Sequence, residues 1–259
     1  MNKIIDSHGH YYTRHYDKDR DKLLKTLHNE KNIELIINCG QNIKENKQVL
    51  DLSTKYDFCY SVIGFFPTFV EELDKLENLE NFIKQLKTEK VIGLGEIGLD
   101  YHWNKPDSII QKEWFIKQIE IANELKLPIC VHSRDAEKDT LDILSNNKVD
   151  YGCVIHCYSY GLASAKKYVN KGFYFGVGGT STYKQNNDLR EAIKYIPLEQ
   201  ILLETDAPYL TPEPHRRQRN DASQIIYVAE NIAKIKDISV DKVIEITNKN
   251  TKQFYKIKE

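Results

Sequence analysis

The feature that most constrains the fold is a repeated alternation of short apolar runs with longer segments of helical spacing. The short runs lie at residues 4–5, 35–39, 59–66, 91–99, 128–132, 152–157, 173–178 and 201–205. Near-continuous apolar runs of this length are typical of strands that are buried on both faces of a parallel sheet. The sequence therefore predicts eight parallel strands.

Between these runs, apolar side chains recur every three or four positions and predict helices that cover a sheet. One such stripe runs from Leu73 to Leu86, a second from Phe115 to Leu125, and helical stretches follow at 220–236 and 239–256. Eight strands alternating with helices in 259 residues predict an α/β fold, a (β/α)8 TIM barrel forming a single domain over residues 1–259, because such barrels need about 250 residues. The alternation alone also allows a doubly wound open sheet.

Composition excludes several classes of protein. Lys and Arg number 37 and Asp and Glu 38, a net charge of −1, which argues against a basic nucleic-acid scaffold and an acidic disordered chain but allows a local basic patch. No apolar run approaches the ~18 residues of a membrane span. The chain passes directly from Met1-Asn2-Lys3 into the first apolar run, so we expect no signal peptide and a cytoplasmic location.

The five cysteines are odd in number, and most lie in or beside apolar runs. We therefore expect reduced, mostly buried thiols rather than a disulfide framework. Cys153 and Cys157 flank His156, which is a spacing that zinc sites can use. On a strand, however, both cysteines would point away from His156, because side chains alternate between faces.

Ionisable residues gather where five of the apolar runs end. The stretches are DSHGH at 6–10, GEIGLD at 95–100, VHSR at 131–134, IHC at 155–157 and LETD at 203–206. In a barrel these strand ends meet on one face, where (β/α)8 enzymes carry their catalytic residues. The chemistry at these ends therefore favours the barrel over the open sheet.

These strand ends supply four histidines and two carboxylates: His8, His10, His132, His156, Glu96 and Asp206. Imidazole and carboxylate together suit zinc, iron, manganese and similar ions. Six ligands are too many for one tetrahedral ion and suit two ions that share a bridging carboxylate. A single buried histidine is more often an ordinary core residue, but a carboxylate among apolar residues is costly unless it is paired or bound to metal. Their joint placement favours a metal centre.

The chain resembles the TatD family of metal-dependent deoxyribonucleases, which belongs to the amidohydrolase-like barrels. The resemblance runs from about Ile4 to the C-terminal helix, and its most specific stretch is LETDAPYLTP at 203–212. The short histidine motifs, by contrast, are shared with other barrel hydrolases. The resemblance implies hydrolysis of DNA phosphodiester bonds, of an exonucleolytic kind, with two divalent ions (Mg2+, Mn2+ or Zn2+) and no organic cofactor. DNA is then the expected partner.

The resemblance also implies a role for each ligand. His8 and His10 would hold one ion, and His132 and His156 the second. Glu96 would bridge the two ions. Asp206 would bind the first ion and accept the proton of the attacking water, so Glu96 and Asp206 are the predicted catalytic residues.

Two departures from the family pattern leave the substrate open. Phe66 stands where the family commonly has the histidine of Gly-x-His-Pro, and residues 216–222 read RRQRNDA in place of Arg-Gly-x-x-Asn-Glu-Pro. Neither departure touches the predicted ligands. One alternative is a barrel metallohydrolase for a small ester, lactone, amide or phosphoester, and another is a module that uses its ions structurally. Oligomeric state is not predicted.

Contacts to substrate are predicted from residue chemistry. Arg134 and Arg217, the latter within the cluster Arg216, Arg217 and Arg219, are candidates for binding phosphate, because guanidinium pairs with phosphate oxygens in a fork. A solvated basic loop is the alternative for the cluster. Tyr158, Tyr209 and Trp103 are candidates for stacking on unpaired bases. Glu204, two residues before Asp206, is a candidate proton relay.

Overall fold

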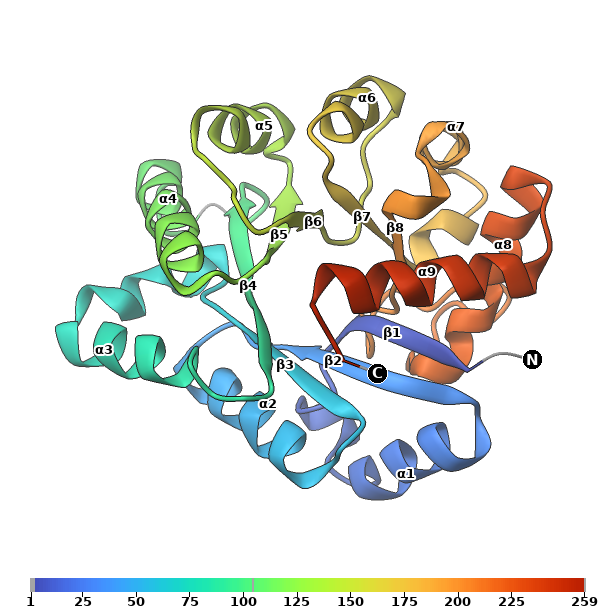
Figure 1. Cartoon of the computed structure of the whole chain (residues 1–259), viewed down its shortest axis with the longest axis horizontal. Helices are drawn as coiled ribbons and strands as arrows, with labels where there is room; N and C mark the ends of the chain where they lie inside the picture. The colour runs from blue at the N-terminus through green and yellow to red at the C-terminus, as the bar shows by residue number, and fades with distance from the viewer. Residues whose placement is uncertain (1–2, 104, 259) are drawn as a thin grey trace. The chain divides into compact units, whose positions relative to one another are not determined.

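The computed structural model describes residues 3–103 and 105–258 (Figure 1). The strands follow one another through a parallel sheet in the order of the sequence, β1 to β8, as in a (β/α)8 barrel. They are β1 (Ile4–Gly9), β2 (Ile33–Cys39), β3 (Cys59–Ile63), β4 (Val91–Asp100), β5 (Ile129–Arg134), β6 (Cys153–Ile155), β7 (Tyr174–Val177) and β8 (Ile201–Leu203). Each falls within or overlaps a predicted apolar run. A doubly wound sheet, whose strand order reverses, is excluded.

Helices separate the strands along the chain. The α-helices are α1 (Arg20–Glu30), α2 (Ile43–Lys55), α3 (Leu76–Gln85), α4 (Ser108–Leu125), α5 (Glu137–Asn146), α6 (Leu162–Asn170), α7 (Asn187–Tyr195), α8 (Ile225–Lys236) and α9 (Val240–Phe254). The 3-10 helices are η1 (Arg14–Tyr16), η2 (Pro67–Asp74), η3 (Gly179–Thr182), η4 (Leu198–Gln200) and η5 (Ala222–Gln224). The predicted stripe from Leu73 to Leu86 is divided, because Lys75 adopts an extended backbone between η2 and α3.

The chain divides into two compact units. The first unit comprises Met1–Asn38 with Cys157–Glu259, and the second comprises Cys39–His156. In the first unit β7 pairs with β8, and β1 pairs with β2. A bridge between Gly9 and Ala207 brings the segment after β8 beside β1, so the first and last strands of the chain are neighbours. Helix α9 packs against both of these strands.

In the second unit the parallel strands run β3, β4, β5, β6. Helix α4 packs on β4, and two of its buried glutamines bond to backbone at the carboxyl ends of strands. Gln111 accepts a hydrogen bond from the Asp100 amide at 2.9 Å, and Gln118 exchanges two hydrogen bonds with the Phe65 backbone. These bonds fix the ends of β3 and of β4, the strand that carries Glu96.

The thiols agree with the sequence-based expectation. All five cysteines are free, and all except the half-buried Cys157 are buried. Among the described residues, no helix is both long enough and apolar enough to cross a membrane. A single domain over residues 1–259 and a cytoplasmic location stay predictions.

Candidate metal centre

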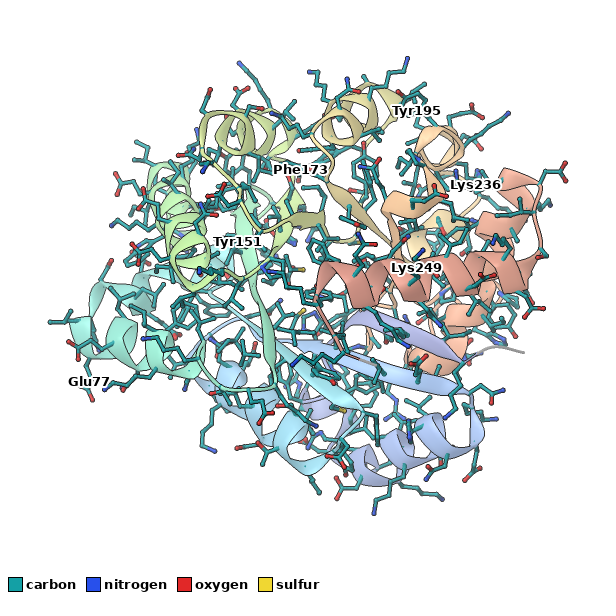
Figure 2. The ribbon with its side chains drawn as sticks, in the orientation of Figure 1. Glu77, Tyr151, Phe173, Tyr195, Lys236 and Lys249 are labelled. Atoms are coloured by element: carbon teal, nitrogen blue, oxygen red, sulfur yellow. The ribbon has the colours of Figure 1, made fainter. Side chains whose placement is uncertain are left out.

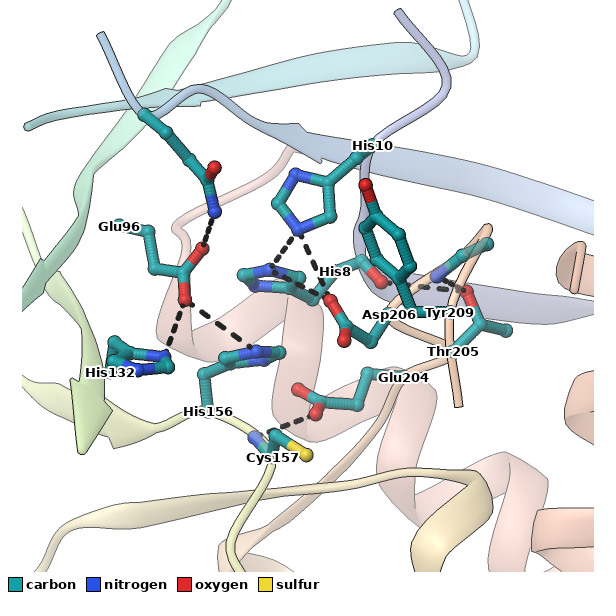
Figure 3. A network of polar contacts seen from close by, with 12 residues as sticks. His8, His10, Glu96, His132, His156, Cys157, Glu204, Thr205, Asp206 and Tyr209 are labelled. Carbon is teal, nitrogen blue, oxygen red and sulfur yellow. Dashed lines mark hydrogen bonds and ion pairs between the residues drawn. The ribbon is translucent and has the colours of Figure 1, made fainter. Parts of the chain in front are cut away.

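Three predicted ligands meet in the first unit, and we call them the histidine-pair cluster: His8, His10 and Asp206 (Figure 3). His8 lies in β1, His10 directly follows that strand, and Asp206 follows β8. Nε2 of His10 lies 3.1 Å from Oδ1 of Asp206 and 3.2 Å from Nε2 of His8. Both histidines are buried, whereas 15% of the Asp206 side chain is exposed. The two strand ends thus bring together side chains almost 200 positions apart.

The buried carboxylate of Asp6 holds these two strand ends together. It accepts hydrogen bonds from the Thr205 hydroxyl at 2.7 Å and from the Thr205 amide at 3.0 Å. Burial raises the pKa of Asp6 to about 7, although the hydrogen bonds from Thr205 and His8 act to lower it. Asp206, which follows Thr205, has a left-handed backbone conformation with φ of 56°. Its amide donates a hydrogen bond to the His8 carbonyl at 3.0 Å. Asp tolerates this conformation better than most residues.

Tyr12 contacts the far side of the His10 ring. Its hydroxyl lies 3.1 Å from Nδ1 of His10, and both side chains are buried. A histidine that binds a metal through one nitrogen usually donates the N–H of the other to an acceptor, which fixes its tautomer. The Tyr12 hydroxyl can accept that hydrogen bond and leave Nε2 of His10 unprotonated toward His8 and Asp206.

Glu204 is buried and accepts a hydrogen bond from the Cys157 amide at 2.7 Å. Its carboxylate fits only because Gly176, in β7, has no side chain: a Cβ there would lie 2.0 Å from Oε2 of Glu204. Oε1 of Glu204 is thus occupied by the hydrogen bond from the Cys157 amide. The relay role of Glu204 stays a prediction.

In the second unit three other predicted ligands meet, and we call them the glutamate cluster: Glu96, His132 and His156 (Figure 3). Oε1 of Glu96 lies 2.9 Å from Nδ1 of His132 and 3.8 Å from Nε2 of His156. Oε2 of Glu96 accepts a hydrogen bond from the Gln41 side chain at 2.8 Å. Gln41 thus orients the carboxylate so that its other oxygen faces both imidazoles.

Asp100 holds the opposite nitrogen of the His132 ring. Its Oδ2 lies 3.0 Å from Nε2 of His132, while its Oδ1 accepts from the amides of His102 and Trp103. Burial acts to raise the pKa of Asp100, but the bond to His132 and its charge prevail and lower it. For His132 burial acts to lower the pKa, and the hydrogen bonds to Asp100 and Glu96 outweigh it, so the pKa is raised.

Each cluster, taken by itself, has the chemistry of a metal site. Ligand atoms of a tetrahedral ion with bonds of ~2.0–2.2 Å lie roughly 3.3–3.6 Å apart. The three ligand atoms of the histidine-pair cluster are 3.1–3.8 Å apart. Buried nitrogens that face one another around a carboxylate fit a cation better than they fit a core. The glutamate cluster offers the same donor types.

The predicted substrate contacts differ in their surroundings. Arg134 is exposed at the end of β5, and Arg217 is exposed in the loop before α8. Arg219 instead pairs with Asp19 at 2.7 Å, and Arg216 lies over the ring of Tyr183 at 4.1 Å. Those two arginines therefore have structural contacts that the sequence did not predict.

The aromatic candidates are also separated by burial. Tyr158 is buried, so the prediction that it stacks on a base is wrong, whereas Tyr209 and Trp103 are exposed. Phe66, which replaces the family histidine, packs its ring against His132 with centroids 4.5 Å apart. An apolar ring thus stands where the family commonly has a histidine.

The sequence matches the model for TatD-related DNases over residues 5–256. The chain belongs to this family. Among similar TatD-family sequences, an uncharacterized metal-dependent hydrolase of Bacillus subtilis, YabD, is 37% identical over 98% of this chain and 99% of its own length. The Escherichia coli hydrolase YcfH, also uncharacterized, is 34% identical over 98% of this chain and 96% of its own length.

A solved structure of a TatD homolog from Escherichia coli, YjjV, has 27% sequence identity and a TM-score of 0.91, with 98% of both chains covered. The prediction of a (β/α)8 barrel of the TatD family is confirmed. The chain is a metal-dependent hydrolase, as its relatives are named. The individual roles of the six ligands stay predictions.

In this TatD-family chain, residues that were not predicted also contact the ligands of the two clusters or hold their strand ends. Tyr12 lies in the turn after β1, where the Thr13 amide donates to the His10 carbonyl, so its contact with His10 does not follow from strand alternation. Asp6 and Asp100 lie within stretches already singled out, yet nothing in their spacing specifies their partners. Gln41 carries no local signal, since its contact with Glu96 joins β4 to the loop after β2.

Proposed function

We propose that this chain hydrolyses DNA phosphodiester bonds exonucleolytically, using two divalent ions of Mg2+, Mn2+ or Zn2+. One observation carries the proposal: each compact unit gathers imidazole nitrogens around a buried or nearly buried carboxylate, in a chain of the TatD-related DNase family. Such ions, when bound, lower the pKa of a water ligand and stabilise negative charge that develops on phosphate oxygens.

The histidine-pair cluster would hold one ion through His8, His10 and Asp206. The glutamate cluster would hold the second through His132, His156 and Glu96, and Glu96 is also proposed to bridge the two ions. Tyr12 and Gln41 would keep these ligands oriented. Preorganised ligands of this kind lose little conformational entropy when an ion binds.

Asp206 is the proposed proton acceptor. It is the most exposed member of its cluster, so water can reach its carboxylate, and its Oδ1 lies 3.1 Å from Nε2 of His10. Arg134 and Arg217, both exposed, are proposed to bind the phosphate. Their guanidinium groups would offset the negative charge of the phosphate locally, although the chain as a whole has a net charge of −1.

The test is digestion of end-labelled DNA by purified protein, together with elemental analysis. Asp206→Asn should lower the rate by about 10²–10⁴-fold, as removal of a general base does. Glu96→Gln should reduce bound metal, and loss of both ions rather than one would support the bridge. Glu77→Gln, on α3 (Figure 2), is the matched control and should change neither.

Two results would contradict the proposal. One is unchanged DNA hydrolysis in Asp206→Asn. The other concerns the mode of cleavage, because products cut internally from the earliest time points would exclude an exonuclease.

A second candidate, hydrolysis of a small ester, lactone, amide or phosphoester, is favoured by one contact. The Phe66 ring against His132 makes the wall of the glutamate cluster apolar, which suits an uncharged substrate better than a phosphate. A panel of model phosphodiesters, esters, lactones and amides with added Mn2+ separates the two. Faster turnover of an uncharged ester than of any phosphodiester would favour this candidate.

A further inference from the structure

Tyr209 is a half-exposed aromatic residue beside the histidine-pair cluster. It follows Asp206 by three residues in the segment after β8, and 47% of it is exposed. Its ring lies next to that of His10, with centroids 6.3 Å apart (Figure 3). Because Tyr209 is so exposed, core packing does not account for a large aromatic side chain this close to predicted metal ligands.

The backbone of Tyr209 is held at both ends. Its amide donates to the Asp206 carbonyl at 2.9 Å, and its carbonyl accepts from the Asn220 side chain at 2.7 Å. Asn220 is fully buried and also donates to the Thr205 carbonyl at 2.9 Å. The ring is therefore carried by a fixed segment, so ordering it for a ligand costs little entropy.

The neighbouring rings leave Tyr209 suited to stacking. His10 is tilted by 56° to it, and His15 forms a T-shaped contact with it at 81°, with centroids 5.7 Å apart. Neither of these two rings lies parallel to Tyr209, and both hold its ring in place by contact. An aromatic face held in this way binds planar groups by stacking.

Other tyrosines in the same unit lack this combination. Tyr158 is 2% exposed, and Tyr183 is buried with Arg216 lying over its ring. Tyr195, at the end of α7, is as exposed as Tyr209 at 45%, but it contacts Lys166 rather than a predicted ligand (Figure 2). Tyr209 combines exposure, a fixed backbone and contact with His10.

We propose that Tyr209, in contact with His10 and His15, is a stacking subsite for an unpaired nucleobase of the substrate. The base would belong to a nucleotide adjoining the phosphodiester at the histidine-pair cluster. The inference rests on the proposed hydrolysis of DNA and adds the part of the substrate that is recognised. Since stacking tolerates any base, the subsite would select unpaired ends rather than a sequence.

The test compares two single-stranded oligonucleotides that differ only in whether one nucleotide near the cleaved end has its base. Abasic positions are placed in turn at the first few nucleotides. Binding is measured by fluorescence anisotropy with phosphorothioate versions, and hydrolysis with the natural linkage. The proteins are wild type, Tyr209→Ala, Tyr209→Phe and the control Tyr195→Ala.

For the intact oligonucleotide, Tyr209→Ala should weaken binding and raise KM by about 5- to 150-fold, and Tyr209→Phe should stay near wild type. At one abasic position the effect of Tyr209→Ala should disappear, because the base it would stack on is absent. Tyr195→Ala should match wild type on every substrate.

An equal effect of Tyr209→Ala on the intact and on all abasic oligonucleotides would overturn the subsite, as would no effect at all. The proposed function fails separately: base-dependent binding without hydrolysis would support the subsite and refute the nuclease. Absence of both binding and hydrolysis would refute both.

Discussion

At the scale of single residues, the ligand set depends on side chains that would not themselves bind metal. Tyr12 is the clearest case, because its hydroxyl lies 3.1 Å from Nδ1 of His10. Loss of such a partner typically lowers metal affinity or activity by about 10- to 100-fold. Tyr12→Phe should therefore weaken metal binding by roughly tenfold or more, measured by competition with a chelator.

Tyr11→Phe is the control for this prediction. The Tyr11 hydroxyl accepts from the Ala222 amide and is fully buried, so its loss should lower stability. It should leave metal affinity unchanged, because the hydroxyl does not contact His10. Equal losses of metal affinity in the two variants would mean that Tyr12 acts only through overall stability.

The ligand types and their strand ends could be predicted from sequence, and their partners could not. His8, His10 and Asp206 stand out because ionisable residues at the ends of apolar runs are unusual. The contacts of Gln41 with Glu96 and of Asp100 with His132 depend on side-chain directions and on loop conformation. Sequence spacing specifies neither, and the same limit explains why the burial of Tyr158 was missed.

The thiols allow a second prediction at this scale. Burial raises the pKa of Cys59 to about 12 and that of Cys153 well above its usual value, so neither forms thiolate near neutral pH. Cys157 is half-buried. Iodoacetamide at pH 8 should therefore modify Cys157 first in the folded protein, and all five after denaturation, as read by peptide mass spectrometry. Labelling of Cys59 at the same rate would contradict this assignment.

At the scale of elements, the sequence predicted the strands better than their ends. The predicted run 152–157, which contains His156, and the run 201–205, which Asp206 follows, correspond to the three-residue strands β6 and β8. Cys157 and Asp206 adopt left-handed backbone, which ends strand geometry near both ligands. Beyond these strand ends, side-chain hydrogen bonds such as that from Thr205 to Asp6 take the place of backbone hydrogen bonds between strands. The spacing of apolar residues in the sequence does not predict such side-chain bonds.

The packing of β7 on the segment after β8 gives a prediction for Gly176. A Cβ at this position would meet Oε2 of Glu204 at 2.0 Å, so Gly176→Ala must displace a buried carboxylate. Overpacking of this kind costs about 1–3 kcal/mol. The free energy of unfolding, measured in urea, should fall by that amount. Gly161→Ala is the control: its nearest neighbour is Asp188 Cβ at 3.8 Å, so it should cost less than about 1 kcal/mol.

At the scale of the whole molecule, chain length and strand count were compatible with a barrel and with an open sheet, and the ionisable residues at five strand ends favoured the barrel. In the structure, the bridge between Gly9 and Ala207 places the segment after β8 beside β1. The division into two compact units was not predicted, because no linker or shift in composition marks residues 38 or 157.

Metal binding should stabilise the whole chain, because the clusters exist only when distant strand ends are folded. A ligand at 100 times its Kd adds about 2.7 kcal/mol to the free energy of unfolding, which raises Tm by roughly 5–10 °C for a protein of this size. Adding Mn2+ or Zn2+ to metal-free protein should produce such a shift in differential scanning fluorimetry. His10→Ala should remove the part due to the histidine-pair cluster and His132→Ala the part due to the glutamate cluster. If either variant alone abolishes the entire shift, binding of the two ions is coupled, as the proposed bridge through Glu96 would make it. A Tm that metal leaves unchanged in the wild type would contradict the metal centre itself.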